Sequence, residues 1–206
     1  MLSSCAFFAC ADFHVLPRCA PMVFPKRQSI WSSVLACAAA CLQCSAVAGQ
    51  AEDFNLESIG ARGGFPESGS GRNFNQAELF TDWDLPWNWD LGKELHLRPQ
   101  VDASVGWLGD GTYAAAIGTI GPRLVLSRER LPVSIVGGTS PTLLSRTVFR
   151  DKDFGINFQF TLRIGLDYDF APHWRLSYHF QHMSDAGLSS KNPALNMHMF
   201  GLSYLF

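Results

Sequence analysis

Residues 174–206 read WRLSYHFQHMSDAGLSSKNPALNMHMFGLSYLF and decide the fold, because two of their segments alternate apolar and polar side chains. In the first segment the even positions from Trp174 to Phe180 are apolar and the odd positions from Arg175 to Gln181 are polar. In the last segment the apolar face consists of Phe200, Leu202, Tyr204 and Phe206. A period of two with an apolar outside and a polar inside is typical of the strands of a membrane β-barrel.

Three polar residues interrupt the apolar face of these two segments. His182 and Ser184 continue the even positions of the first, and Asn196 stands on the same face at the start of the second. If the segments are adjacent antiparallel strands joined by the loop 185–195, the three side chains lie at similar height and within reach of one another. They are the first candidates for a functional site.

The first 48 residues differ from the rest of the chain. Lys26 and Arg27 precede an apolar run, 30–47, which ends in the small residues 46–48, so we expect a secretory signal peptide cleaved after Ala48. Translation would then start at Met1 or at Met22. A lipoprotein signal ending at Cys37 is the less favoured alternative, because the apolar run before it is short.

All six cysteines stand in this leader, so the expected mature chain, 49–206, has none to form disulfides. It carries no apolar run of membrane-helix length either, so it would span a membrane only as strands. The charge of the whole chain is nearly balanced, at −2, which argues against a nucleic-acid partner.

The alternation predicts an all-β fold, an eight-stranded antiparallel transmembrane barrel of the outer-membrane type, over residues 49–206. The expected strands are 55–65, 76–90, 95–107, 113–126, 131–139, 156–170, 174–184 and 196–206. Pro86 should interrupt the second of them. With both termini in the periplasm, the longer connections fall on the cell surface.

Eight strands enclose a lumen just wide enough to be filled by side chains. We therefore expect the inward charges Arg98, Asp102, Arg163 and Asp167 to pair with one another. A pore, or a carrier of small ligands, is disfavoured. The terminal Phe206 and the alternation before it resemble the signal that the barrel-assembly machinery recognises.

The polar trio has the residue types of a hydrolytic site. A serine becomes a nucleophile beside a base, and the base needs a third group to orient its ring; Ser184, His182 and Asn196 can fill these roles. Gly187 and neighbouring loop amides could donate to an oxyanion. His179 and His198 are more simply explained by packing, and no metal-binding set appears at useful spacing.

The stretch 182–188, HMSDAGL, resembles the H-x-S-N-A-G motif of the lipid A 3-O-deacylase family, the PagL-like acyloxyacyl hydrolases of the outer membrane. The resemblance covers the barrel in outline and is specific over about the last thirty residues. It implies hydrolysis of the ester at the 3-position of lipid A by a Ser–His–acid triad that faces the outer leaflet. His182 would match the base, Ser184 the nucleophile and Gly187 a backbone oxyanion donor.

Two residues depart from that motif. Asp185 stands where the family has an Asn that is implicated in the oxyanion hole, and an ionised carboxylate cannot donate a hydrogen bond. Asn196 stands where the family's best-known members have Glu; an amide can fix the tautomer of a histidine but adds no charge. Both changes predict slower chemistry, an altered optimum or none.

The sequence thus predicts an outer-membrane serine esterase that acts on lipid A in lipopolysaccharide, without metal or cofactor, as a monomer or homodimer. The alternative is a catalytically silent barrel with a structural or adhesive role. The two differ in whether any acyl chain is released.

Overall fold

The computed structural model describes residues 54–206 apart from 72 and 192. The expected leader, 1–48, with its cleavage site and its cysteines, lies outside the described residues. Within them, no helix has the length and apolar character needed to cross a membrane.

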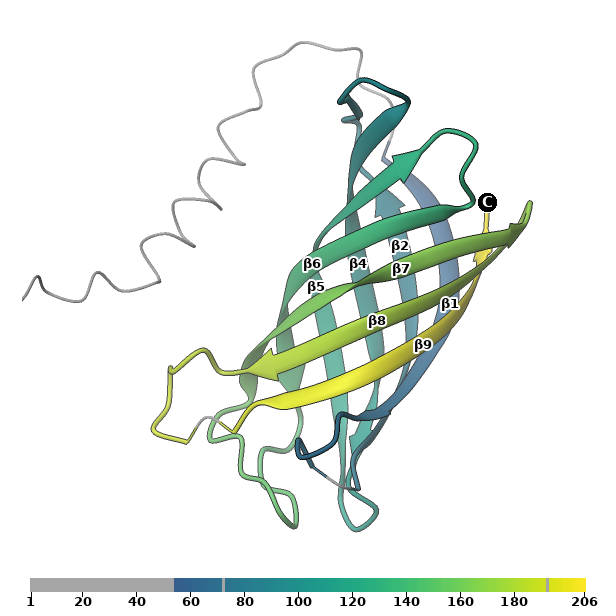
Figure 1. The fold of residues 1–206 in the computed structure, drawn as a ribbon. Helices are drawn as coiled ribbons and strands as arrows, with labels where there is room; N and C mark the ends of the chain where they lie inside the picture. Colours follow the sequence, from purple (N-terminus) through teal and green to yellow (C-terminus); the bar gives the residue numbers. More distant parts are fainter. Residues whose placement is uncertain (1–53, 72, 192) are drawn as a thin grey trace, which may run out of the picture. The chain divides into compact units, whose positions relative to one another are not determined.

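The described chain forms one antiparallel sheet that closes on itself (Figure 1). Its strands are β1 (Asn55–Pro66), β2 (Asn75–Asp84), β3 (Trp89–Asp90), β4 (Leu95–Gly109), β5 (Ala114–Arg128), β6 (Val133–Leu144), β7 (Phe158–Ala171), β8 (Trp174–Ser184) and β9 (Leu195–Leu205). The order is β2-β1-β9-β8-β7-β6-β5-β4-β3, and pairing of β2 with β4 closes an eight-stranded barrel that the two-residue β3 only flanks. The predicted fold is confirmed.

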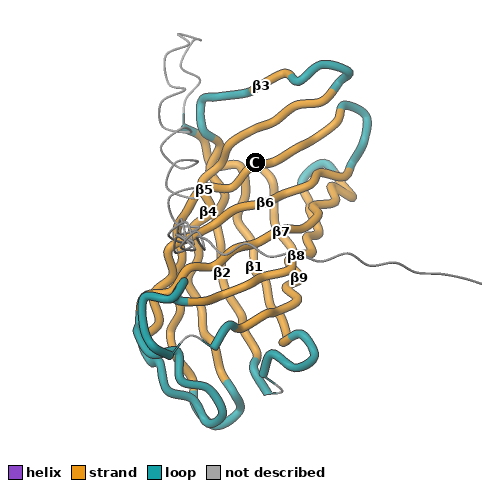
Figure 2. The backbone as a smooth tube through the Cα atoms, turned by 60° about the vertical axis from the view of Figure 1, so that its left-hand side comes forward, coloured by secondary structure: helices purple, strands orange, loops and turns teal. Residues whose placement is uncertain are grey.

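The alternation in the sequence corresponds to the two faces of this barrel. On β8, Trp174, Leu176 and Tyr178 are exposed, whereas Arg175 and His179 are buried in the lumen. Across the barrel the outward side chains are large and apolar, which is the surface that lipid requires. The connections gather at the two ends, and those that follow β1, β4, β6 and β8 share one end (Figure 2).

Most strand bounds lie within two residues of the expected ones, but two of the expected strands differ by more. The expected strand 76–90 is broken into β2 and β3, because Pro86 has no N–H to donate and the chain leaves the ladder after Leu85, whose N–H reaches Pro99 O at 3.1 Å. The strand expected to end at Thr139 continues to Leu144 as β6. Residues 140–155 were expected to connect two strands, but Ser140 and Pro141 pair with β7.

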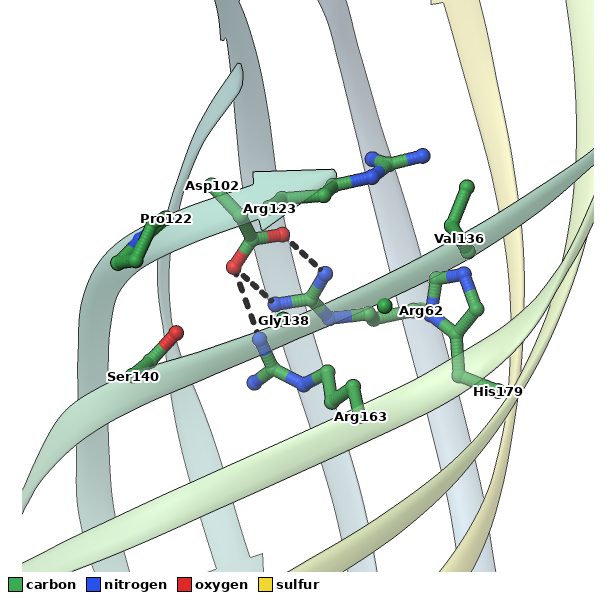
Figure 3. A pocket seen from close by; sticks show the side chains of 10 residues that line it. Arg62, Asp102, Pro122, Arg123, Val136, Gly138, Ser140, Arg163 and His179 are labelled. Carbon is green, nitrogen blue, oxygen red and sulfur yellow. Dashed lines mark hydrogen bonds and ion pairs between the residues drawn. The ribbon is translucent and has the colours of Figure 1, made fainter. Parts of the chain in front are cut away.

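Buried ion pairs fill the middle of the lumen. Arg62 donates from Nε to Glu78 Oε2 at 2.7 Å. Its Nη1 donates to Asp102 Oδ2 at 2.6 Å, and Arg163 Nη1 donates to Asp102 Oδ1 at 2.8 Å (Figure 3). The predicted pairing of Arg163 with Asp102 is therefore found. Arg98 does not join it; its Nη1 pairs with Asp84 at 3.3 Å.

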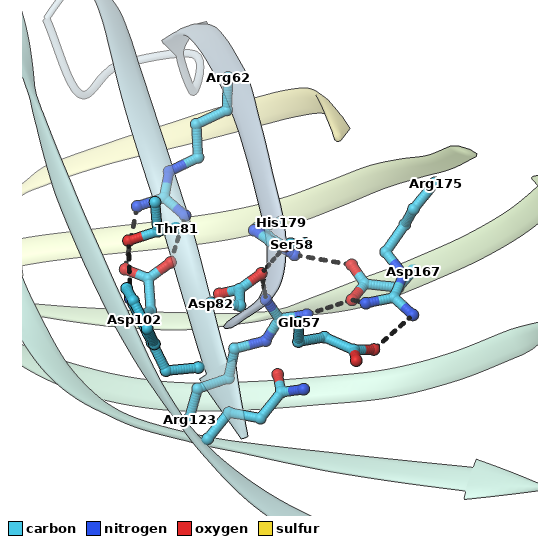
Figure 4. A network of polar contacts seen from close by, with 12 residues as sticks. Glu57, Ser58, Arg62, Thr81, Asp82, Asp102, Arg123, Asp167, Arg175 and His179 are labelled. Atoms are coloured by element: carbon cyan, nitrogen blue, oxygen red, sulfur yellow. Dashed lines mark hydrogen bonds and ion pairs between the residues drawn. The ribbon is translucent and has the colours of Figure 1, made fainter. Parts of the chain in front are cut away.

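A second group of charges lies beside the first (Figure 4). Arg123 pairs with both Asp82 and Asp167, and His179 Nε2 lies 3.3 Å from Asp167 Oδ1. Asp167, expected to pair with Arg98 or Arg163, is thus held mainly by Arg123, and His179 is a packed lumen residue, as expected. The alternation predicted which charges point inward but not their partners.

The rest of the lumen is apolar towards the end that carries the loops after β1, β4, β6 and β8. The buried cluster there contains Phe74, Leu108, Ala115, Ile117, Leu144, Phe149, Phe154, Met183, Leu195, Met197 and Met199. The cavity beside the Arg62 network measures only about 20 Å³, about the space of one water molecule. This cavity therefore has no room for a carried ligand.

Replacing Arg62 with Met should destabilise the barrel by about 3–5 kcal/mol, because Glu78 and Asp102 would keep their burial and lose their main counter-charge. Thermal unfolding of the detergent-folded protein, followed by its heat-modifiable migration in electrophoresis, measures the loss. Arg128→Met is the control: this half-exposed side chain lies 3.8 Å from Glu94 and should contribute less than about 1 kcal/mol. Equal shifts in the two variants would contradict a stabilising role for the network.

Candidate active site

The pairing of β8 with β9 brings the polar trio together on the outer wall. His182 stands directly opposite Asn196 in the register, and Ser184 lies two residues further along the same face of β8. All three side chains are half-buried, whereas their neighbours Met183 and Met197 are buried in the lumen. The site therefore lies on the lipid-facing side, near the end of the barrel that carries the loop after β8.

His182 and Asn196 are hydrogen-bonded side chain to side chain. Nδ1 of the His182 ring lies 2.7 Å from Oδ1 of Asn196. The amide nitrogen of Asn196 in turn donates to Oε2 of Glu67 at 2.9 Å. Glu67 is the first residue after β1, so the contact joins the first loop of the barrel to its last strand.

Ser184 stands opposite Phe160 of β7, and His182 stands opposite Leu162. Within the described residues no hydrogen bond joins the Ser184 hydroxyl to the His182 ring. Two residues along a strand span about 7 Å, a gap that rotation of the imidazole towards Ser184 can narrow. Phe160 and Leu162 give the site an apolar flank on the outer wall, where the acyl chain of a lipid can lie.

The loop that follows Ser184 is organised by the carboxylate of Asp185, which is fully buried. Its Oδ1 accepts from the Gly187 N–H at 2.7 Å, and its Oδ2 accepts from the N–H and the hydroxyl of Ser189 at 2.9 and 2.5 Å. Ala186 and Gly187 both have a positive φ, of 59° and 81°, so the chain turns sharply here. In this structure the Gly187 N–H is thus engaged by Asp185.

Two opposing effects act on the acidity of Asp185. Burial raises the pKa of its carboxyl, but hydrogen bonds from the Ser189 hydroxyl and from the Gly187, Ser189 and Leu188 amides outweigh burial, so the pKa lies below its ordinary value. The carboxyl is ionised at neutral pH, and the carboxylate accepts hydrogen bonds from Gly187 and Ser189 of its own loop. The lowered pKa means that the ionised form stabilises this loop.

Replacing Asp185 with Asn should weaken the loop by about 1–3 kcal/mol, because the amide nitrogen cannot accept from Ser189. Hydrogen exchange of residues 186–190 should become about 5–150-fold faster in the variant. In the wild type the protection should persist at neutral pH and disappear only as the pH falls below about 4, through the lowered pKa. Exchange rates equal to those of a control, Asp151→Asn, would contradict this role.

The site rests on a packed lumen wall. Met183, Leu195 and Met197 alternate with the trio along β8 and β9 and are fully buried. A close-packed wall keeps the backbone of the site in one register. Within residues 54–206 apart from the two that are not described, no group of His, Cys, Asp and Glu side chains could hold a metal ion.

Two residues of this neighbourhood were not anticipated from the sequence. Glu67 contacts the Asn196 amide, and the Ser70 hydroxyl accepts from the Asn196 backbone N–H at 2.5 Å. Barrel closure was expected and makes the first strand a neighbour of the last. The register of that pair, in which Pro66 stands opposite Met197, is not encoded in the alternation.

Comparisons with known proteins show which family the chain resembles and which solved barrel it is similar to. The model of the family described as "Lipid A 3-O-deacylase (PagL)" matches residues 75–205. The lipid A deacylase PagL of Bordetella bronchiseptica is 28% identical over 150 residues, which cover 67% of this chain and 80% of that protein. The crystal structure of the outer membrane enzyme PagL superimposes with a TM-score of 0.63 at 20% identity, covering 72% of this chain and 99% of that one.

Proposed function

We propose that the chain, which belongs to the lipid A 3-O-deacylase (PagL) family and forms an outer-membrane β-barrel, is a serine esterase that removes the 3-O-linked acyl chain of lipid A. The single observation that carries the catalytic detail is the hydrogen bond of 2.7 Å between His182 Nδ1 and Asn196 Oδ1 on the lipid-facing wall, beside Ser184. A substrate embedded in the outer leaflet would meet these groups without entering the lumen.

The roles follow from the chemistry of each group. His182 Nε2, the nitrogen not engaged by Asn196, takes the proton of the Ser184 hydroxyl as the serine oxygen attacks the acyl carbonyl. The imidazolium returns this proton to the departing 3-oxygen of the sugar, and the acyl group stays on Ser184 until water releases it as a free fatty acid. The Ser184–His182 contact would tighten when the lipid is bound, as catalytic hydrogen bonds often do.

The oxyanion donor remains a proposal. Gly187 is the expected residue, and its N–H would have to be shared with, or released by, the Asp185 carboxylate to serve a tetrahedral intermediate. Asp185 itself, an acceptor only, is better suited to hold the loop than to donate. Because the Gly187 N–H is already bound to Asp185, we expect slow hydrolysis of the ester.

The test is mass spectrometry of lipid A from cells that express the protein. We expect the loss of one 3-hydroxyacyl group from the 3-position. An unchanged lipid A mass, with the folded barrel present in the outer-membrane fraction, would contradict the esterase proposal. It would favour the silent barrel. The absence of a Ser184–His182 hydrogen bond in the described residues supports that alternative.

Three further expectations stay proposals. Residues 1–48 would be a leader, which N-terminal sequencing of the exported protein tests. The barrel-assembly machinery would recognise the terminal segment that ends at Phe206, and deletion of Phe206 should lower the amount inserted. A homodimer would show in the mass of the protein in detergent.

A further inference from the structure

The site holds a carboxylate that the Ser–His–Asn trio does not include. Glu67 Oε2 lies 2.9 Å from the side-chain nitrogen of Asn196, whose oxygen lies 2.7 Å from His182 Nδ1. The three side chains form a line of hydrogen bonds from the first loop, through β9, to the ring on β8. Glu67 lies outside the residues 75–205 that the family model matches.

We infer that Glu67 is a positioning residue, which acts through Asn196 to hold His182 in the tautomer that can serve as a base. This inference rests on the proposed function and deepens it. An ionised carboxylate only accepts hydrogen bonds, so the Asn196 group that faces Glu67 must be the amide NH2. The carbonyl oxygen of Asn196 then faces His182, Nδ1 of His182 must carry the proton, and Nε2 keeps a free lone pair.

Without Glu67, nothing would fix which atom of the Asn196 side chain, the oxygen or the nitrogen, faces His182. The oxygen and nitrogen of an Asn side chain can exchange places, and their order is set by what each contacts. If the amide NH2 of Asn196 turned to His182 Nδ1, the ring would carry its proton on Nε2 and could not accept one from Ser184. The carboxylate also places a negative charge one side chain away from the imidazolium that forms when His182 takes the proton, which the neutral Asn196 alone does not provide.

Backbone contacts keep Glu67 in place for this role. Its N–H donates to the Asn196 carbonyl at 3.0 Å, and its carbonyl accepts from the Ser70 N–H at 3.0 Å. Lys152 from the loop after β6 donates to the Ser70 and Ala194 carbonyls at 2.5 and 2.6 Å and so ties the loops together. These contacts involve the main chain of Glu67, so they survive a change of its side chain to Gln.

The test compares Glu67→Gln with the wild type on purified lipopolysaccharide in detergent. We expect kcat to fall about tenfold, the size expected when one charge-assisted hydrogen bond is lost, with KM unchanged. Ser70→Ala is the matched control, because it removes the other side-chain contact of the same loop with Asn196 and leaves the Glu67 carboxylate in place. Equal losses in the two variants would show a merely structural loop anchor and overturn the inference.

The effect of Glu67→Gln can also be measured in a protein that already carries the substitution Asn196→Glu. In Asn196→Glu a carboxylate accepts directly from His182 Nδ1, so the neighbouring Glu67 is no longer needed and its like charge becomes unfavourable. Adding Glu67→Gln to that variant should therefore cost nothing or raise kcat, whereas in the wild type it lowers kcat. The same tenfold loss in both backgrounds would overturn the inference.

The tautomer can be read without any activity. In protein labelled with 15N-histidine, the ring signals of His182 are identified by their loss in His182→Gln. In the wild type, when the ring is neutral, they should show a protonated Nδ1 and an unprotonated Nε2. They should show a mixture in Glu67→Gln. An unchanged tautomer would overturn the inference, while an inactive wild type that keeps the expected tautomer would count against the esterase alone.

Discussion

Ser184→Ala should release 3-hydroxy fatty acid from lipopolysaccharide at least about 10³-fold more slowly than the wild type, because the reaction loses its nucleophile. The half-buried Ser184 side chain makes no hydrogen bond to His182 among the described residues, so its removal should leave the fold intact. Release of the acyl chain, followed by mass spectrometry in detergent, measures the loss. Heat-modifiable migration confirms that the variant is folded.

Ser190→Ala is the control for this substitution. Ser190 is an exposed serine of the same loop and should keep activity within about twofold of the wild type. Equal release by the wild type and Ser184→Ala would reject Ser184 as the nucleophile. Loss of activity in both variants alike would point to a loop that tolerates no change rather than to a nucleophile.

Strand parity could be predicted from the sequence because the side-chain period of a strand is fixed at two. The outward positions of His182, Ser184 and Asn196 followed from that period alone, and the structure has them there. The end of β6 did not follow, since Ser140-Pro141 has the composition of a turn and yet pairs with β7. Local composition decides a strand end only where tertiary pairing does not override it.

Glu67 is the part of the site that could not be predicted from the sequence, because its position depends on the register of β1 against β9. Glu67 contacts Asn196 because Pro66 pairs with Met197 across the seam where β1 meets β9. No periodic signal reports how two strands slide along each other, and a polar loop gives no hint of which carboxylate it directs at a neighbour. The same limit explains why Arg123, rather than the expected Arg98 or Arg163, holds Asp167.

The departure of Asn196 from the family motif looks different once its partners are known. An amide beside a histidine supplies no charge, which predicted weak catalysis or none. Here the side-chain NH2 of Asn196 donates to the Glu67 carboxylate, so the negative charge of Glu67 acts on the His182 ring through Asn196. The buried charge of Asp185 is likewise engaged by its own loop.

Asn196→Leu should lower kcat about a hundredfold with little change in KM, which is the low end of what general base catalysis contributes. Leucine is close to asparagine in size but accepts no hydrogen bond, so the proton of the His182 ring would no longer be held on Nδ1. The substrate would still bind to the apolar wall, so the loss should fall on kcat. Steady-state kinetics on lipopolysaccharide in detergent separate the two constants.

His198→Leu is the matched control, since His198 lies two residues further along the same outer face of β9. Its Nδ1 contacts the Tyr178 hydroxyl at 2.9 Å, not His182, so activity should stay within about threefold. If Asn196→Leu retained the activity of His198→Leu, the histidine would need no partner to be oriented. Equal activity would remove Asn196, and with it Glu67, from the catalytic chain, while leaving Ser184 and His182 to be judged by their own variants.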